Sequence, residues 1–152
     1  MTVEIILFQT DIAQNMGSIM RTATCWGVPV HLIEPMGFIW NEPKMRRAGM
    51  DYLDRATYTR HMSWQKYLDG KPQGRLVALT TKGSESLLDF TFEPGDRLIF
   101  GRESAGLPDD VVALADARVR IPMREGERSM NVAQSCAVAT FEALRQLDNL
   151  KP

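Results

Sequence analysis

The chain has 152 residues, the length of one compact domain, and we expect residues 1–152 to form a single domain. Hydrophobic residues make up 44% and charged residues 24% of the sequence, which is ordinary for a soluble domain. The formal net charge of −1 argues against a surface that binds nucleic acid everywhere, so any RNA contact must come from a local patch. No apolar run approaches the ~18 residues of a membrane span, and no signal peptide is visible. We therefore expect a cytoplasmic protein without a membrane contact.

Strand-like and helix-like patterns alternate along the chain. In chain order we expect a strand over 3–8, a helix over 17–26 that ends at Gly27, a strand over 28–33, a short helix over 43–48 and a strand over 56–60. The order continues with a capped helix over 63–68, strands over 75–80 and 97–100, a helix beginning near Pro108, a strand over 117–121 and a long helix over 131–147. This alternation predicts an α/β fold with a mostly parallel sheet and flanking helices.

The last predicted helix has a wide apolar surface. One stripe at helical spacing contains Val132, Cys136, Ala139, Ala143 and Leu147, and a second contains Ala133, Ala137, Phe141 and Leu144. Two stripes exceed what one core face needs, so we expect part of this surface to be buried against a partner chain.

The cysteines and histidines do not indicate a metal site. Cys25 and Cys136 fall within predicted helices and have no His or Cys neighbour at the spacing of metal ligands. We expect both to be small buried core residues. His31 and His61 have no obvious partner in the sequence, and no Ser-His-Asp set can be assigned.

Two loops near the C-terminal end predict a ligand pocket. Residues 101–108 and 121–131 each follow a short apolar strand and lead into a helix. Ligands of open α/β sheets bind outside the carboxyl ends of strands, so two such loops suggest one site. Glycines allow close approach of backbone to a ligand, while Ser129 and Asn131 offer polar contacts and a helix cap. Glu103 is read either as a capping or salt-bridging residue or as part of the site. The spacing is neither that of a phosphate-binding P-loop nor that of a dinucleotide fingerprint.

Two further segments have both a structural and a functional interpretation. Asn15 is expected to cap the first helix, and Arg21 follows about a turn and a half later. The segment is either a capped helix with a surface arginine or a phosphate site at a helix N-terminus. Lys44, Arg46 and Arg47 form a basic cluster, which is either a solvated face or a contact with nucleic-acid phosphates.

These segments resemble, in order, the three motifs of the SPOUT superfamily of RNA 2′-O-methyltransferases. The matching motifs are Asn15-x-Gly17-x-x-x-Arg21, then Phe100-Gly101-x-Glu103-x-x-Gly106-Leu107-Pro108, then Ile121-Pro122-Met123 with Ser129-Met130-Asn131. The runs 32–38, 46–52 and 78–83 are similar to those of the TrmL type, which methylates cytidine or uridine at the tRNA wobble position. The resemblance covers nearly the whole chain. Departures include Ala13 and Gln14 in place of prolines, Val132-Ala133 after the third motif, and Phe141 in place of a tyrosine.

The resemblance implies a deep trefoil knot at the C-terminal end, a homodimer, and S-adenosylmethionine as the cofactor. By the resemblance, the cofactor is bound at Leu79, Gly101, Ile121 and Ser129, with Met130 adjacent, and Arg21 activates the ribose hydroxyl. We also assign cofactor binding to Thr80, Glu103, Gly106, Met123, Met130 and Asn131. Further catalytic roles are assigned to Asn15, Glu103 and Ser129, and RNA binding to Lys44, Arg46, Arg47 and Arg128. No metal is expected.

The implied reaction is methyl transfer to the ribose 2′-OH of nucleotide 34 in the anticodon arm of tRNA, with tRNA-Leu as the expected substrate. Arginine stays protonated at neutral pH, so Arg21 is expected to stabilise the developing alkoxide or to orient an RNA phosphate rather than to accept the proton. The alternatives are methylation of another tRNA position or of rRNA, a non-catalytic RNA-binding dimer, and a different α/β nucleotide-binding enzyme.

Overall fold

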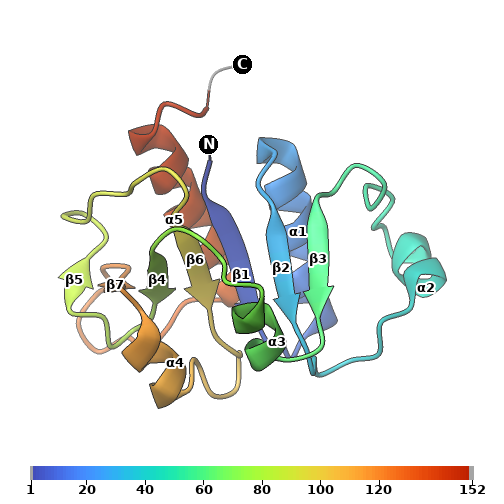
Figure 1. Cartoon of the computed structure of the whole chain (residues 1–152), viewed down its shortest axis with the longest axis horizontal. Coiled ribbons are helices and arrows are strands. Elements are labelled where there is room, and N and C mark those ends of the chain that lie inside the picture. Colours follow the sequence, from blue (N-terminus) through green and yellow to red (C-terminus); the bar gives the residue numbers. More distant parts are fainter. Residues whose placement is uncertain (1, 151–152) are drawn as a thin grey trace.

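A computed structural model, described here for residues 2–150, shows a single parallel sheet flanked by helices (Figure 1). The strands are β1 (Glu4–Phe8), β2 (Val30–Ile33), β3 (Tyr58–His61), β4 (Leu76–Leu79), β5 (Glu85–Ser86), β6 (Arg97–Phe100) and β7 (Ala117–Arg120). The helices are α1 (Ala13–Trp26), α2 (Glu42–Arg47), α3 (Trp64–Asp69), α4 (Asp109–Leu114) and α5 (Val132–Gln146). The strand order is β3-β2-β1-β6-β4-β7-β5, and each pairing of these strands is parallel. The predicted α/β fold is confirmed.

Each face of the sheet has its own hydrophobic core. Successive side chains of a strand point to opposite faces. Accordingly, Ile5 and Leu7 of β1 pack with α1 and α5, while Ile6 and Phe8 pack with α3 and α4. Figure 1 shows the two pairs of helices on opposite sides of the sheet. Because both faces are covered, the central strands β1, β6 and β4 are apolar apart from Glu4 and Arg97 at the start of β1 and β6, which is typical of parallel sheets.

The helix ends confirm some of the predicted capping residues and correct one. Gly27 ends α1 in the left-handed conformation with φ of 66°, and the side chain of Ser63 accepts a hydrogen bond from the backbone N–H of Lys66 at the start of α3. Asn131 caps α5 by accepting from two backbone N–H groups. The prediction that Asn15 caps α1 is wrong, because α1 begins at Ala13 and Asn15 lies within its first turn.

The short strand β5 was not predicted, and it creates a crossing at the C-terminal end of the sheet. β4 and β5 lie on either side of β7, and Leu79 and Glu85 are both registered with Val119. Residues 80–84 therefore pass across the end of β7. The passage is close: a Cβ atom on Gly83 would stand 2.5 Å from the carbonyl carbon of Val119. A trefoil knot requires a crossing of this kind, and the knot itself stays a prediction.

The described part of the chain contains no helix that is long and apolar enough to cross a membrane. Within residues 2–150, no group of three or more His, Cys, Asp or Glu side chains is placed to hold a metal ion. Cys136 is buried as expected, whereas Cys25 is exposed on α1, so the prediction that both are core residues is wrong for Cys25.

Candidate active site

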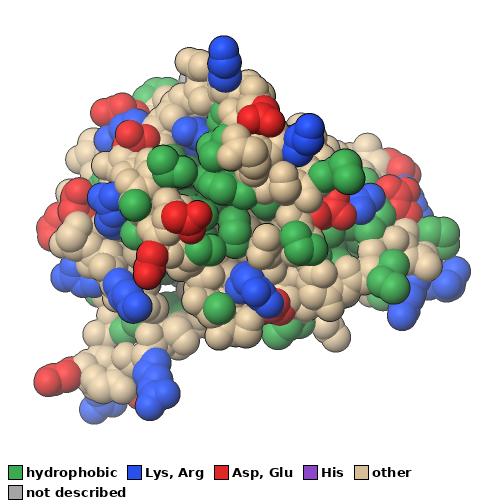
Figure 2. Space-filling view, turned by 60° about the horizontal axis from the view of Figure 1, so that its bottom comes forward, with side chains coloured by type: hydrophobic (Ala, Val, Ile, Leu, Met, Phe, Trp, Pro, Cys, Tyr) green, Lys and Arg blue, Asp and Glu red, His purple; other side chains and the backbone are tan. Residues whose placement is uncertain are grey.

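A cleft of about 610 Å³ opens at the carboxyl ends of β4, β6 and β7. The loops after these three strands form its walls. Figure 2, in which the lower edge of Figure 1 comes forward, shows apolar side chains exposed on this edge among Lys, Arg, Asp and Glu side chains. The structure brings together on this cleft all ten residues expected to bind a cofactor: Leu79, Thr80, Gly101, Glu103, Gly106, Ile121, Met123, Ser129, Met130 and Asn131.

The loop after β6 folds back on itself to make one wall. The backbone N–H of Gly106 donates to the carbonyl of Arg102 over 2.8 Å, and the N–H of Arg102 donates back over 3.3 Å. Gly106 has a φ of 67°, which favours glycine. Gly101 lies so close to this turn that a side chain there would collide with its backbone. The glycines therefore shape the loop, and its backbone is exposed to the cleft.

The cleft suits a ligand with an aromatic ring and a few polar groups. Leu79, Ile121, Met123 and Met130 contribute apolar surface, and Met130 is 38% exposed. Backbone groups of the two glycine-containing loops supply hydrogen-bonding partners beside them. Such a combination of apolar walls and few convergent polar groups is typical of small-molecule sites. The residues present therefore fit an adenosine-containing cofactor.

Glu103 and Asn15 together join the three predicted motifs. Its carboxylate accepts hydrogen bonds from the backbone N–H groups of Asp11 (3.1 Å) and Ile12 (2.8 Å) and from the side chain of Asn15 (3.2 Å). The side-chain amide of Asn131 donates to the side-chain oxygen of Asn15 over 3.0 Å. Residues 15, 103 and 131 are far apart in the sequence but form one connected network. The carboxylate also lies at the N-terminus of α1, where a negative charge is favourable.

Sequence reasoning missed Asp11, which binds the same loop. Its carboxylate accepts hydrogen bonds from the Arg102 guanidinium and from both the backbone N–H and the hydroxyl of Ser104. These bonds, those from Ser104 above all, hold the pKa of the Asp11 carboxyl down at about 2. The sequence offered no signal beyond an acidic residue in a turn.

Arg21 does not lie on the wall of the cleft. It is exposed on α1, and its guanidinium is 5.6 Å from the centre of the Tyr52 ring. The Tyr52 hydroxyl in turn donates to the carbonyl of Gly17, and burial raises the pKa of this tyrosine. Arg21 forms no ion pair with any residue of the described range 2–150. Arg21 follows Asn15 by six residues, which at about 100° per residue is about 240° beyond one full turn of the helix. Asn15 faces the cleft loops, so Arg21 lies on a different face of α1.

The predicted RNA-binding residues fall in two places. Arg128 lines the cleft. Lys44, Arg46 and Arg47 lie on α2, beyond the opposite edge of the sheet next to β3 (Figure 1). Arg46 is paired with Asp54 over 2.8 Å, which raises the pKa of Arg46. The structure therefore does not bring these four cations together within one chain.

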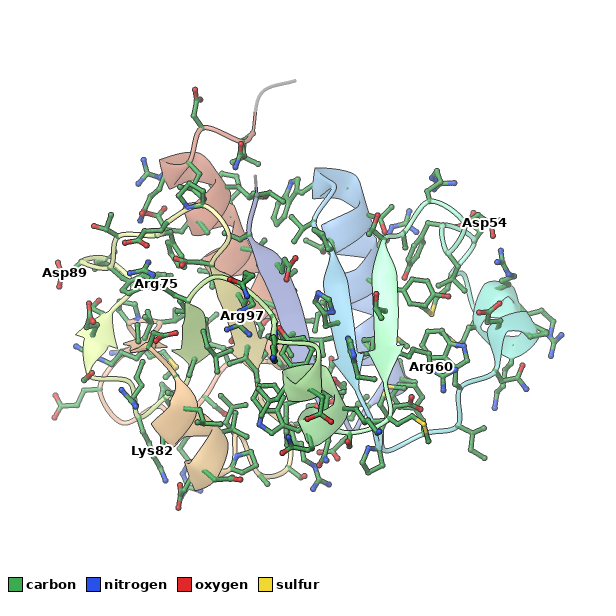
Figure 3. All side chains as sticks on the ribbon, in the orientation of Figure 1. Asp54, Arg60, Arg75, Lys82, Asp89 and Arg97 are labelled. Atoms are coloured by element: carbon green, nitrogen blue, oxygen red, sulfur yellow. The ribbon has the colours of Figure 1, made fainter. Side chains whose placement is uncertain are left out.

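Another basic residue at the cleft was not predicted. Lys82 belongs to the crossing 80–84 and lines the cleft. Its side chain extends toward the lower edge beside α4 (Figure 3). Arg102 is paired with Asp11, whereas Lys82 and Arg128 form no ion pair among the described residues. These two cations favour a polyanion that approaches this edge.

The two histidines, which lacked partners in the sequence, are partners in space. His31 Nδ1 is 2.9 Å from His61 Nε2, and His31 Nε2 is 3.2 Å from Glu4. Burial lowers the pKa of His61, and the neighbouring His31 lowers it further. This network lies on the α3 face of the sheet against Tyr67 and does not reach the cleft.

Comparison with known proteins identifies the class of enzyme to which this fold and cleft belong, a methylase. The family model of the SpoU rRNA Methylase family matches residues 2–141, and the chain belongs to this family. A protein of Ancylobacter novellus named tRNA (cytidine(34)-2′-O)-methyltransferase is 47% identical over 148 residues, covering 96% of this chain and 94% of that protein.

Solved structures agree with this membership. A structure from a study of the 2-OH methylation of C/U34 on tRNA superimposes with a TM-score of 0.90 at 41% identity, covering 97% of each chain. The SpoU methyltransferase AviRb from Streptomyces viridochromogenes, in complex with the cofactor AdoMet, superimposes with a TM-score of 0.84 at 26% identity. That match covers 97% of this chain and 58% of the longer AviRb chain.

Proposed function

We propose that this chain is a tRNA (cytidine(34)/5-modified uridine(34)-2′-O)-methyltransferase that uses S-adenosylmethionine. The observation that carries the proposal is the cleft itself: segments of the second and third motifs line it, and Asn15 of the first motif bonds to both Glu103 and Asn131. The names of the relatives support the choice of tRNA and of nucleotide 34. AdoMet bound to AviRb supports the choice of cofactor.

The proposed cofactor fits the cleft without a metal ion. S-adenosylmethionine supplies a methyl group on a positively charged sulfur, which is already an activated leaving group. Leu79, Ile121 and Met130 would enclose the adenosine, and the backbone of the loop after β6 would supply polar contacts. The residues around the cleft then have to hold the ribose oxygen in line with the methyl carbon, at roughly 3 Å, and exclude water.

We assign Arg21 to the acceptor side of the reaction. A guanidinium is a poor proton acceptor but a strong donor to oxyanions, so Arg21 would stabilise the developing alkoxide or orient an RNA phosphate. Its freedom from ion pairs within the described residues supports this role. Arg21 lies off the cleft wall. The bound RNA or a partner chain therefore has to bring the ribose hydroxyl within reach of both Arg21 and the cofactor.

The proposed partner is a second copy of this chain. On the outer face of α5, Val138 is 42% and Phe141 is 47% exposed, and Phe141 packs against Trp26 of α1, with ring centres 5.9 Å apart. Exposed apolar side chains on adjacent helices favour burial against a partner. A homodimer through this face would place two clefts on one molecule that recognises an anticodon arm. We also propose tRNA-Leu as the substrate and the cytoplasm as the location.

The test uses purified protein, methyl-labelled S-adenosylmethionine and total tRNA, followed by mapping of the labelled nucleotide. The proposal predicts 2′-O-methylation at position 34. The family description makes ribosomal RNA the second candidate, so rRNA is included as a parallel substrate. Label at another tRNA position or in rRNA would contradict the proposal, and absence of label in all substrates would favour a non-catalytic RNA-binding protein.

A further inference from the structure

The carboxylate of Asp11 ties the start of α1 to the cleft loop. One carboxylate oxygen accepts from Arg102 Nε (3.1 Å) and Nη2 (2.9 Å). The other accepts from the backbone N–H of Ser104 (3.0 Å) and from its hydroxyl (2.6 Å). The bonds span more than 90 residues of sequence, and the Asp11 side chain is only 19% exposed. Four hydrogen bonds to one carboxylate, two of them from a guanidinium, make a strong attachment.

The attachment is reciprocal. Glu103, between the two residues that Asp11 holds, accepts from the backbone N–H groups of Asp11 and Ile12. Three consecutive loop residues, 102 to 104, are therefore fixed to the two residues that precede α1. We call this set of bonds the Asp11 latch.

The backbone of Asp11 is also fixed from the other side. The N–H of Gly37 donates to the carbonyl of Thr10 over 2.9 Å. A Cβ atom on Gly37 would stand 2.5 Å from the Asp11 carbonyl oxygen, so only glycine allows this contact. Asp11 thus lies between the segment after β2 and the cleft loop, and the latch acts from an anchored position.

We propose that Asp11 is a positioning residue of the methyl-transfer site, which keeps the loop after β6 in the shape that receives the cofactor. This inference rests on the proposed function. Arg102, Glu103 and Ser104 all line the cleft, whereas Asp11 does not. Asp11 acts on the ligand through the loop.

The expected effect is on cofactor affinity more than on the chemical step. Without the latch, the loop samples other shapes, and the cofactor has to select the competent one, which lowers its apparent affinity. Once the cofactor is bound, its own contacts hold the loop. Asp11→Ala should therefore raise the Kd and KM for S-adenosylmethionine by at least about tenfold, while kcat at saturating cofactor stays within about threefold of wild type.

The test is calorimetric titration of the full-length protein with S-adenosylmethionine, with methylation kinetics on tRNA as the second readout. Glu142→Gln is the matched control, because Glu142 also pairs with an arginine and has its pKa lowered to about 2, but lies on α5 away from the cleft. The control should bind the cofactor like wild type. An Asp11→Ala Kd within twofold of wild type, or a loss confined to kcat, would overturn the proposal.

A second variant covers the case in which Asp11→Ala does not fold, as judged by circular dichroism. Asp11→Asn keeps the shape of the side chain and removes the charge, and we expect its Kd to rise at least about threefold. An unchanged Kd in a folded Asp11→Asn protein would also overturn the latch. If wild type itself failed to bind S-adenosylmethionine, the proposed function would fail instead, so the two failures are distinguishable.

Discussion

Gly101 lies directly against the backbone of Gly106: a Cβ atom on Gly101 would stand 2.3 Å from the carbonyl carbon of Gly106 and 2.4 Å from the nitrogen of Leu107. Real Cβ atoms do not approach backbone this closely, so any other residue at position 101 must displace the turn that forms one wall of the cleft. From the sequence, we expected this glycine to allow a ligand close to the backbone. In the structure, Gly101 allows the backbone at Gly106 and Leu107 to pack against it.

Gly101→Ala should therefore weaken binding of S-adenosylmethionine at least about tenfold, which corresponds to about 1.4 kcal/mol. Calorimetric titration measures the effect. Gly70→Ala is the control, because Gly70 has an ordinary φ of −72° and a Cβ atom there meets only the Tyr67 carbonyl oxygen at 3.4 Å. Equal affinities for Gly101→Ala and wild type would contradict the assignment of this cleft.

Arg21→Ala should lower turnover by about 10²–10³-fold, the loss typical of removing one donor to a developing oxyanion. Cofactor affinity should stay unchanged, because Arg21 does not line the cleft. Arg21→Lys should not restore activity, since an ammonium lacks the forked geometry of the guanidinium. Methyl transfer to tRNA measures turnover and calorimetry measures affinity. Retained activity in Arg21→Ala would refute the role of Arg21.

Reversal of charge on α2 should weaken tRNA binding and flatten its dependence on salt. Each lost phosphate contact lowers the slope of log K against log salt by about 0.7–0.9. Arg46 is already paired with Asp54, whereas Arg47 is exposed, so Arg47→Glu should have the larger effect. Filter binding across a salt series measures both quantities. If Arg46→Glu, Arg47→Glu and wild type gave the same slope and affinity, α2 would not contact RNA.

Cys136 should be chemically inert in the folded protein. Its thiol is fully buried on α5, and burial raises its pKa to about 12, with Thr140 lowering it slightly. The thiolate is the reactive form, so little of it exists at neutral pH. A Cys25→Ser variant, which leaves Cys136 as its single thiol, should show no reaction with a disulfide reagent at pH 8 and one reactive thiol after unfolding. Fast reaction in the native state would contradict the burial.

The sequence predicted the order of elements well, because apolar runs and turn residues are local signals. Strands and helices were expected in the order in which they occur, except for β5. This strand, Glu85–Ser86, has two polar residues and no apolar run. It exists because residues 80–84 cross the end of β7, which is a tertiary contact that no local pattern records.

Contacts between distant segments explain the other differences. Asn15 was expected to cap α1 because it is a good capping residue near a predicted helix start. Instead, the carboxylate of Glu103 accepts hydrogen bonds from the backbone N–H groups of Asp11 and Ile12. Asn15 lies within the helix, and its side-chain amide donates to the same carboxylate. Glu103 is about 90 residues away from this helix in the sequence, so no local pattern predicts their hydrogen bonds. The resemblance of the motifs predicted only that the two segments belong to one site.

The most direct test of the account is to map the product of wild-type enzyme, labelled S-adenosylmethionine and total tRNA at single-nucleotide resolution. We expect a 2′-O-methyl group on nucleotide 34, formed about 10²–10³-fold more slowly when Arg21→Ala replaces wild type under conditions where the cofactor still binds. A methyl group at another nucleotide, or label at position 34 that Arg21→Ala forms as fast as wild type, would contradict this expectation.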